Sequence, residues 1–286
     1  MGKRWLWLAL AATVFHGVWG ALIEIPEKAG FPATLGYSVW ALTMVPCALA
    51  ALASRGWKLE REARSILLGG IVGFTGAGGQ LVLFQALRTG PAYLVFPFIA
   101  IYPTVTVTLS ALLLKERASR RAWTGIVLAI LAVPMCSYHP GGAPGSSGKL
   151  WLLLAAVVFL SWGVQGFFLK FANQRMHAES IFFYMALTAV SLIPFAVAMT
   201  DFSREINWGF RGPYLAAAIQ VLNSIGALLN VNAVRYGKAI IVIPMTALAP
   251  VLTIILSLAL YGIVPHGVTI AGIVLATVAI YLMSEV

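Results

Sequence analysis

The chain has 286 residues, of which 60% are hydrophobic and only 10% are charged. A soluble globular protein carries about 25% charged residues, so this composition, with a mean hydropathy of +0.92, excludes a soluble domain. The net charge of +10 does not indicate nucleic-acid binding, because the basic residues lie in short loops and are not interleaved with stacking aromatic residues. The composition predicts an all-α integral membrane protein.

Ten apolar stretches follow one another along the chain, each near the roughly 20 residues that cross a bilayer as a helix. They are Trp5–Ile23, Ala33–Ala53, Ile66–Leu87, Ala92–Leu114, Ala122–Tyr138, Leu150–Phe171, Ser180–Met199, Tyr214–Val234, Ala239–Tyr261 and Gly267–Ser284. The stretch His139–Lys149 at the midpoint is rich in Gly, Pro and Ser, which is typical of a linker. The sequence therefore predicts two domains, residues 1–138 and 150–286, joined by a linker at 139–149.

The distribution of Lys and Arg predicts the orientation, because these residues accumulate in cytoplasmic loops. If the N-terminus is cytoplasmic, 14 of the 19 Lys and Arg residues fall in cytoplasmic segments. We therefore expect both termini in the cytoplasm, with the protein in a bacterial cytoplasmic (inner) membrane.

The two halves of the chain are related by an internal repeat. An offset of 147 residues aligns residues 79–132 with residues 226–279 without a gap, and about 20 of the 54 positions are identical. The first span of each half aligns less tightly: Trp19-Gly20 is paired with Trp162-Gly163 after a one-residue deletion, which makes Leu160 the counterpart of His16. Such self-similarity indicates a duplicated unit, here five helices long.

An odd number of spans per unit has a topological consequence. A chain that crosses the membrane five times emerges on the opposite side, so the second unit is inserted upside down relative to the first. Inverted repeats of this kind are an architecture of transporters. The sequence therefore predicts ten transmembrane helices arranged as two inverted five-helix repeats.

Two pairs of prolines occupy equivalent positions in spans 4 and 9. Pro97 and Pro103 lie six residues apart, as do Pro244 and Pro250. Proline removes a backbone donor and kinks a helix, so the pairs could line a cavity and bend as it opens. The alternative is that they only set helix packing, since proline is common in membrane helices.

A family resemblance is carried by the segment that follows span 3. It contains Ala86-Leu87, a short turn, a proline-rich span 4, the pair Glu116-Arg117, and Trp123 and Gly125 at the start of span 5. This pattern resembles an EamA domain of the drug/metabolite transporter superfamily, and the resemblance extends over both halves. It implies ten helices around a central cavity lined mainly by spans 1, 3, 4, 6, 8 and 9. The second half departs from the pattern, because Ile263-Val264 replace the Glu-Arg pair.

Ionisable residues inside a membrane span are expensive and are functional candidates by default. His16 lies near the middle of span 1, and Glu24 lies at its end. Both are candidates for proton coupling, because a histidine titrates in the physiological range. The alternative for His16 is a histidine satisfied by a neighbouring helix carbonyl.

Neutral polar and aromatic residues supply the remaining candidates for a substrate-binding cavity. Amides donate and accept hydrogen bonds, which suits hydroxyl, amide or zwitterionic ligands. The alternative is that Asn and Gln join helices and aromatic residues fill space. The cavity candidates are His16, Trp19, Gln80, Tyr102, Gln165, Asn223 and Asn230.

The sequence contains no metal-spaced His/Cys cluster, no Gly-x-Ser-x-Gly nucleophile and no phosphate loop. We therefore predict no enzyme activity, no cofactor and no metal site. The predicted function is secondary transport of a small polar or amphipathic metabolite, amino acid- or drug-like, by alternating access. A permease for a sugar-like solute and a non-transporting helper protein are the alternatives. Expected partners are the small-molecule substrate and the lipid bilayer, with protons as a candidate coupling ion and no nucleic acid. The protein is expected to be a monomer or a homodimer.

Overall fold

The computed structural model describes residues 3–89, 92–136, 150–261 and 266–284, and within these ranges every regular element is helical. The helices are α1 (Arg4–Leu22), α2 (Glu24–Lys28), α3 (Ala33–Ser54), α4 (Ala63–Gly73), α5 (Gly79–Thr89), α6 (Ala92–Ala100), α7 (Pro103–Leu113), α8 (Arg120–Cys136), α9 (Leu150–Asn173), α10 (Ala178–Ser191), α11 (Ile193–Ala198), α12 (Leu215–Tyr236), α13 (Ala239–Thr246), α14 (Ala249–Tyr261) and α15 (Gly267–Ser284). Two π-helical turns, η1 (Phe74–Gly78) and η2 (Phe210–Tyr214), precede α5 and α12.

Helix is present at each of the ten stretches that the sequence predicts. Seven helical segments in the described ranges are long and apolar enough to cross a membrane: Arg4–Lys28, Ala33–Ser54, Ala63–Thr89, Leu150–Asn173, Ala178–Ala198, Phe210–Tyr236 and Ala239–Leu256. Two shorter apolar helices cover Phe98–Leu113 and Gly267–Met283. The predicted linker at 139–149 lies outside the described residues.

The second proline of each predicted pair marks a break in its helix. The chain is interrupted between α6 and α7 directly before Pro103, and between α13 and α14 just before Pro250. Pro97 and Pro244 instead lie within α6 and α13. The second proline of each pair therefore divides spans 4 and 9 at equivalent places, as expected where proline prevents the helix from continuing, whereas Pro97 and Pro244 do not interrupt their helices.

The packing of the helices repeats when the two halves are exchanged. Helix α1 of the first half packs on α12 and α14 of the second half, and α9 of the second half packs on α5 and α7 of the first half. Likewise α3 packs on α12 as α10 packs on α4. Two further pairs, α3 with α10 and α8 with α15, join equivalent helices of the two halves, and α7 packs on α13, which belongs to the equivalent span 9. The interface is thus built twice from related contacts.

Glycine and threonine make the closest of these repeated contacts. Thr253 on α14 donates through Oγ1 to the Gly17 carbonyl oxygen at 3.0 Å, and Thr106 on α7 donates to the Gly163 carbonyl oxygen at 2.7 Å. Because Thr106 and Thr253 are equivalent in the repeat, Gly17 is the counterpart of Gly163. The predicted pairing of Trp19-Gly20 with Trp162-Gly163 is therefore wrong: in three dimensions Trp162 is the counterpart of His16, and Gln165 that of Trp19.

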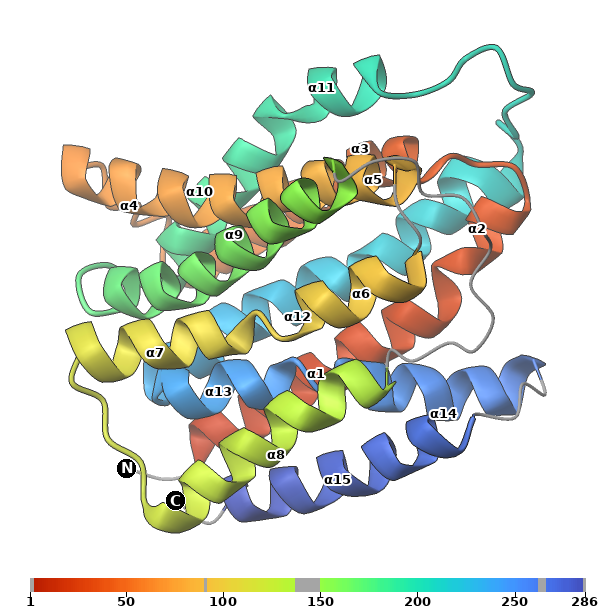
Figure 1. The fold of residues 1–286 in the computed structure, drawn as a ribbon. Helices are drawn as coiled ribbons and strands as arrows, with labels where there is room; N and C mark the ends of the chain where they lie inside the picture. The colour runs from red at the N-terminus through yellow and green to blue at the C-terminus, as the bar shows by residue number, and fades with distance from the viewer. Residues whose placement is uncertain (1–2, 90–91, 137–149, 262–265, 285–286) are drawn as a thin grey trace.

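Both termini lie at one end of the helix bundle, where α1 begins and α15 ends (Figure 1). We call this the terminal end and the opposite end the distal end. Helix α1 leaves the terminal end, whereas α9 runs back toward it (Figure 1). The first helices of the two halves therefore run in opposite directions.

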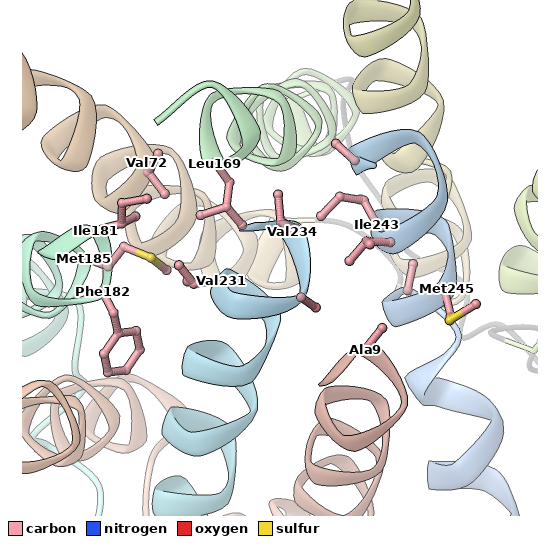
Figure 2. Packing of buried hydrophobic residues seen from close by; sticks show 14 of the residues in the cluster. Ala9, Val72, Leu169, Ile181, Phe182, Met185, Val231, Val234, Ile243 and Met245 are labelled. Atoms are coloured by element: carbon pink, nitrogen blue, oxygen red, sulfur yellow. The ribbon is translucent and has the colours of Figure 1, made fainter. Parts of the chain in front are cut away.

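A buried apolar cluster joins the two halves. Figure 2 shows Leu169 of α9 and Val234 of α12 pointing toward each other, with Ile243 of α13 beside them. Val72 of α4 and Ile181 of α10 belong to the same cluster. These side chains come from both repeats, so apolar packing closes the bundle where α9, α12 and α13 meet.

Gly166 tests whether close approach at these glycines holds the halves together. An ideal Cβ on Gly166 would lie 2.5 Å from Thr106 Oγ1. Overpacking of this kind costs about 1–3 kcal/mol, so Gly166→Ala should lower the thermal unfolding temperature of the purified protein in detergent. Gly70 is the matched control, because its Cβ would meet nothing within 4 Å. Gly70→Ala should leave the unfolding temperature unchanged or raise it slightly. Equal destabilisation by the two substitutions would contradict this account.

Candidate functional site at the interface of the two halves

His16 lies on α1 where that helix crosses α12. The His16 ring packs against Gly226 in the space that a larger side chain at position 226 would fill. A Cβ on Gly226 would lie 2.7 Å from His16 Cδ2. The ring also makes a hydrogen-bonding interaction with the backbone of Asn223. This is the helix-backbone contact that the packing alternative anticipates, whereas proton transfer by His16 stays a prediction.

Trp162 occupies the equivalent position in the other half. A Cβ on Gly79 would lie 2.7 Å from Trp162 Nε1, and this indole N–H donates to the Gly76 carbonyl oxygen at 3.3 Å. Gly79 and Gly76 match Gly226 and Asn223 at the 147-residue offset. Trp162 is therefore the counterpart of His16. The predicted counterpart, Leu160, is 52% exposed on the outer face of α9.

Trp19 and Gln220 form a polar bridge between three helices. The indole Nε1–H of Trp19 donates to Gln220 Oε1 at 2.9 Å, and Gln220 Nε2 donates to the Gly36 carbonyl oxygen of α3 at 3.2 Å. Nearby, the hydroxyls of Thr43 and Ser224 lie 3.0 Å apart, again between α3 and α12. Gln220 and Ser224 thus connect α12 to its neighbours: Gln220 to α1 and α3, and Ser224 to α3.

Gln165 makes the corresponding contact at the π-helical turn η1. Its Nε2 donates to the Val72 carbonyl oxygen at 3.2 Å, and its amide fills the space beside Gly76. The Thr75 hydroxyl donates to Ile71 at 2.7 Å and also reaches Val72. A π-turn leaves the helical ladder locally rearranged and is frequent at functional sites. Here a side chain from the other half occupies it.

The other residues predicted as cavity or proton-coupling candidates are Tyr102, Asn230, Gln80 and Glu24. Tyr102 stands at the α6–α7 break and packs edge-on against Trp162, with ring centroids 5.9 Å apart. The Asn230 Oδ1 atom is buried without a hydrogen-bond partner among the described residues. Gln80 lies partly buried on α5. Glu24 lies apart from this group, exposed on α2 and paired with Lys28 at 2.6 Å.

A buried ion pair at the terminal end was not predicted. Lys170, 15% exposed, lies 3.9 Å from a carboxylate oxygen of Glu116, which is 9% exposed. Lys170 Nζ also donates to the Val234 carbonyl oxygen at 3.0 Å, and Glu116 accepts from the backbone N–H of Ile240 at 3.1 Å. The lysine thus neutralises the carbonyl end of α12, and the glutamate caps the amide end of α13, each at the helix pole that its charge favours.

The sequence contains a signal for this pair. Lys170 lies within a predicted apolar span, and Glu116 belongs to a motif that the second half lacks. An ionisable residue inside a span requires a partner. The sequence does not reveal that Glu116 is that partner, because the two residues are 54 positions apart and meet only through the packing of α7 on α9.

A second polar cluster at the terminal end centres on Glu60 in the loop between α3 and α4. Its carboxylate accepts hydrogen bonds from Ser180 and is bonded to His177, while the Tyr184 hydroxyl donates to the Glu60 backbone carbonyl at 2.6 Å. Burial alone would raise the pKa of Glu60, but the hydrogen bonds from Ser180 and His177 and the His177 charge lower it to about 2. The loop is thereby fixed to the start of α10.

The distal end has a recess. It has a volume of about 750 Å³, and it is formed by the α2–α3 connection, the end of α5 and the segment after α11. The two ends of the bundle therefore differ: apolar packing and ion pairs close one end, and an open, charged depression marks the other.

The Glu116–Lys170 pair predicts a specific pattern of stabilities. Lys170→Met should be strongly destabilising, because it leaves a buried carboxylate without its partner, at a cost of about 3–5 kcal/mol. The double variant Glu116→Gln/Lys170→Met should unfold at a higher temperature than Lys170→Met alone. Lys238→Met is the control, since the Lys238 side chain is exposed. Additive effects of the two substitutions in thermal unfolding would show that the pair is not coupled.

Glu60 predicts a pH dependence. Its folded-state pKa of about 2 lies below the ordinary value of 4.5, so its stabilising contribution is present at neutral pH and is lost as the pH falls from about 4.5 toward 2. The difference in unfolding temperature between wild type and Glu60→Gln should therefore be large at pH 7 and smaller at pH 3.5. Glu62→Gln, at an exposed neighbouring carboxylate, should differ little from wild type at either pH. A Glu60→Gln effect that is constant with pH would refute the assignment.

Comparisons with known proteins agree with this geometry. A solved crystal structure, described only as "Crystal structure of protein", superposes with a TM-score of 0.80 at 18% identity, covering 99% of this chain and 96% of the other. At that identity the likeness concerns the fold alone. A relative from Methanocaldococcus jannaschii, the "Uncharacterized protein MJ1333.1", is 42% identical over 59 residues, which are 21% of this chain and 43% of that relative.

The sequence profile of the EamA-like transporter family matches both halves, at residues 3–138 and 149–285. The profile, the helical fold and the apolar spans agree with the resemblance noted in the sequence. The chain belongs to the EamA-like transporter family and is an integral membrane protein of the drug/metabolite transporter superfamily.

Proposed function

We propose that the protein is a secondary transporter that moves a small polar or amphipathic metabolite across the membrane by alternating access. The observation that carries the proposal is the exchange symmetry of the interface. Each contact of α1 with α12 and α14 has a counterpart in the contacts of α9 with α5 and α7. An interface built twice can exist in two related arrangements, one open to each side of the membrane.

In this proposal all ten helical segments cross the membrane, and the two five-helix halves are inverted relative to each other. The opposite directions of α1 and α9 support the inversion (Figure 1). The excess of Lys and Arg at the terminal end supports a cytoplasmic location for both termini. The membrane is then the cytoplasmic membrane of a bacterium.

The polar residues between the halves supply the proposed substrate path. His16, Trp19, Asn223 and Asn230 come from α1 and α12, and Gln165 comes from α9. They offer donors and acceptors without a fixed charge, which suits a ligand with hydroxyl, amide or dipolar groups. In this arrangement several of them bond to backbone or to each other, so substrate binding would exchange those bonds for bonds to the ligand.

The breaks before Pro103 and Pro250 are the proposed hinges. Each lies on a helix that packs against the first helix of the other half, α7 on α9 and α14 on α1. A broken helix bends with less loss of hydrogen bonding than a continuous one, because the ladder is already interrupted. Movement at these hinges would loosen the contact of α7 with α9 while it tightened the contact of α14 with α1, or the reverse.

Transport in proteoliposomes tests the proposal. Purified protein should catalyse saturable exchange of at least one labelled solute from a panel of amino acids, amines and sugars, whereas protein-free vesicles should not. Pro103→Ala and Pro250→Ala should each lower the exchange rate roughly tenfold with folded protein retained. Pro46→Ala, at an exposed position within the unbroken helix α3, is the matched control and should transport normally. A folded protein that exchanges no solute would favour the helper function, and exchange of sugars alone would favour the sugar permease.

A further inference from the structure

The recess at the distal end has the size of a ligand site. Its volume of about 750 Å³ falls within the roughly 300–1,000 Å³ of small-molecule pockets. Both halves of the chain form it. The lining residues are Glu27, Gly30, Phe31, Pro32, Ala33, Arg88, Met199, Thr200, Asp201, Arg204 and Glu205.

Arg88 supplies an available positive charge at the recess. One guanidinium nitrogen donates to the Met199 backbone carbonyl, which fixes the side chain across the wall. Arg204, by contrast, pairs with Asp201 at 3.1 Å. Among the described residues no carboxylate lies within ion-pair distance of Arg88. Its guanidinium has five N–H donors in a planar fork that matches a carboxylate, and one backbone carbonyl uses only part of that capacity.

Negative charge is also in excess at the same recess. Glu27 and Glu205 form no ion pair among the described residues, whereas Glu24 beside Glu27 is paired with Lys28. Hydrogen bonds from the side chain and backbone of Ser203 hold the pKa of Asp201 below its ordinary value, and its charge is offset by the pairing with Arg204. The wall therefore presents uncompensated charges of both signs, and Phe31 also lines the recess.

We propose that this recess binds a compact dipolar solute, one that carries an ammonium group and a carboxylate on the same molecule. The carboxylate would bond to Arg88, and the ammonium would lie between Glu27 and Glu205. The inference rests on the proposed transport function, because it places the recess at the entrance to the substrate path. A solute with one charge leaves the opposite wall uncompensated, so it binds more weakly.

Four six-carbon probes that differ in the number and position of their charged groups test this inference. They are norleucine and 6-aminohexanoate, which are dipolar, hexylamine, which is a cation, and hexanoate, which is an anion. Binding to the purified full-length protein in detergent is followed by the shift in thermal unfolding temperature as each probe is titrated. We expect at least one dipolar probe to raise the unfolding temperature at a concentration tenfold or more below that needed for hexylamine or hexanoate.

Variants assign the effect to the recess. Arg88→Gln keeps a donor for the Met199 carbonyl and removes the charge, and Glu27→Gln removes a carboxylate. Each should raise the half-maximal concentration of the dipolar probe tenfold or more, with Arg88→Gln shifting preference toward hexylamine and Glu27→Gln toward hexanoate. Arg211→Gln and Glu62→Gln change exposed charges that do not line the recess, and they should bind like wild type.

Three outcomes would overturn the inference: no response to any probe, equal responses to all four, or a dipolar response that Arg88→Gln and Glu27→Gln leave unchanged. The transport measurement is independent of this one. Solute exchange in proteoliposomes without dipolar binding would refute the recess and leave the transport function standing. Dipolar binding without exchange of any solute would refute transport and leave the recess as a binding site.

Discussion

The close approach of α1 to α12 and α14, and of α9 to α5 and α7, is the constraint on which the rest of this structure depends. Membrane helices are not driven together by exclusion of water. They associate through close packing at small residues and through hydrogen bonds between helices. At both crossings glycine lets the backbones approach, and a threonine from the other half donates to the exposed carbonyl. The ring of His16 or Trp162 then fills the space beside a further glycine.

The two halves are related in sequence and packing, yet they differ in the groups that satisfy the same positions. His16 fills the space beside Gly226, and Trp162 fills the equivalent space beside Gly79. The terminal end has the Glu116–Lys170 pair, which matches the poles of α12 and α13, and the second half has Ile263-Val264 in place of the Glu-Arg motif. In the proposed transport cycle, a symmetric scaffold with asymmetric side chains would give the two arrangements unequal free energies, so one of them would be more populated than the other.

Hydrogen bonds between the halves set a further condition on any movement. The bridge from Trp19 through Gln220 to Gly36 and the Gln165 contact at η1 satisfy polar groups that would otherwise be buried alone, at a cost of about 1–3 kcal/mol each. A change of arrangement must provide new partners for these groups. In the proposed transport cycle, water or a polar solute entering between the halves would supply them, and this would couple solute binding to opening.

The sequence by itself determined the membrane class, the duplicated unit, the helical stretches and the proline breaks. Each of these depends on composition, on the length of apolar stretches or on identical residues at a fixed offset, and all of these can be recognised in one sequence. The pairing of His16 with Trp162 was not legible, because the first spans align with a different offset from the rest, and only the contacts with Gly226 and Gly79 reveal it. Tertiary structure alone decided that Lys170 meets Glu116, that Ser180 and His177 meet Glu60, and that Arg88 and Glu27 line one recess. The physical reason is that charges far apart in sequence become partners through helix register and crossing geometry, which a linear pattern does not contain.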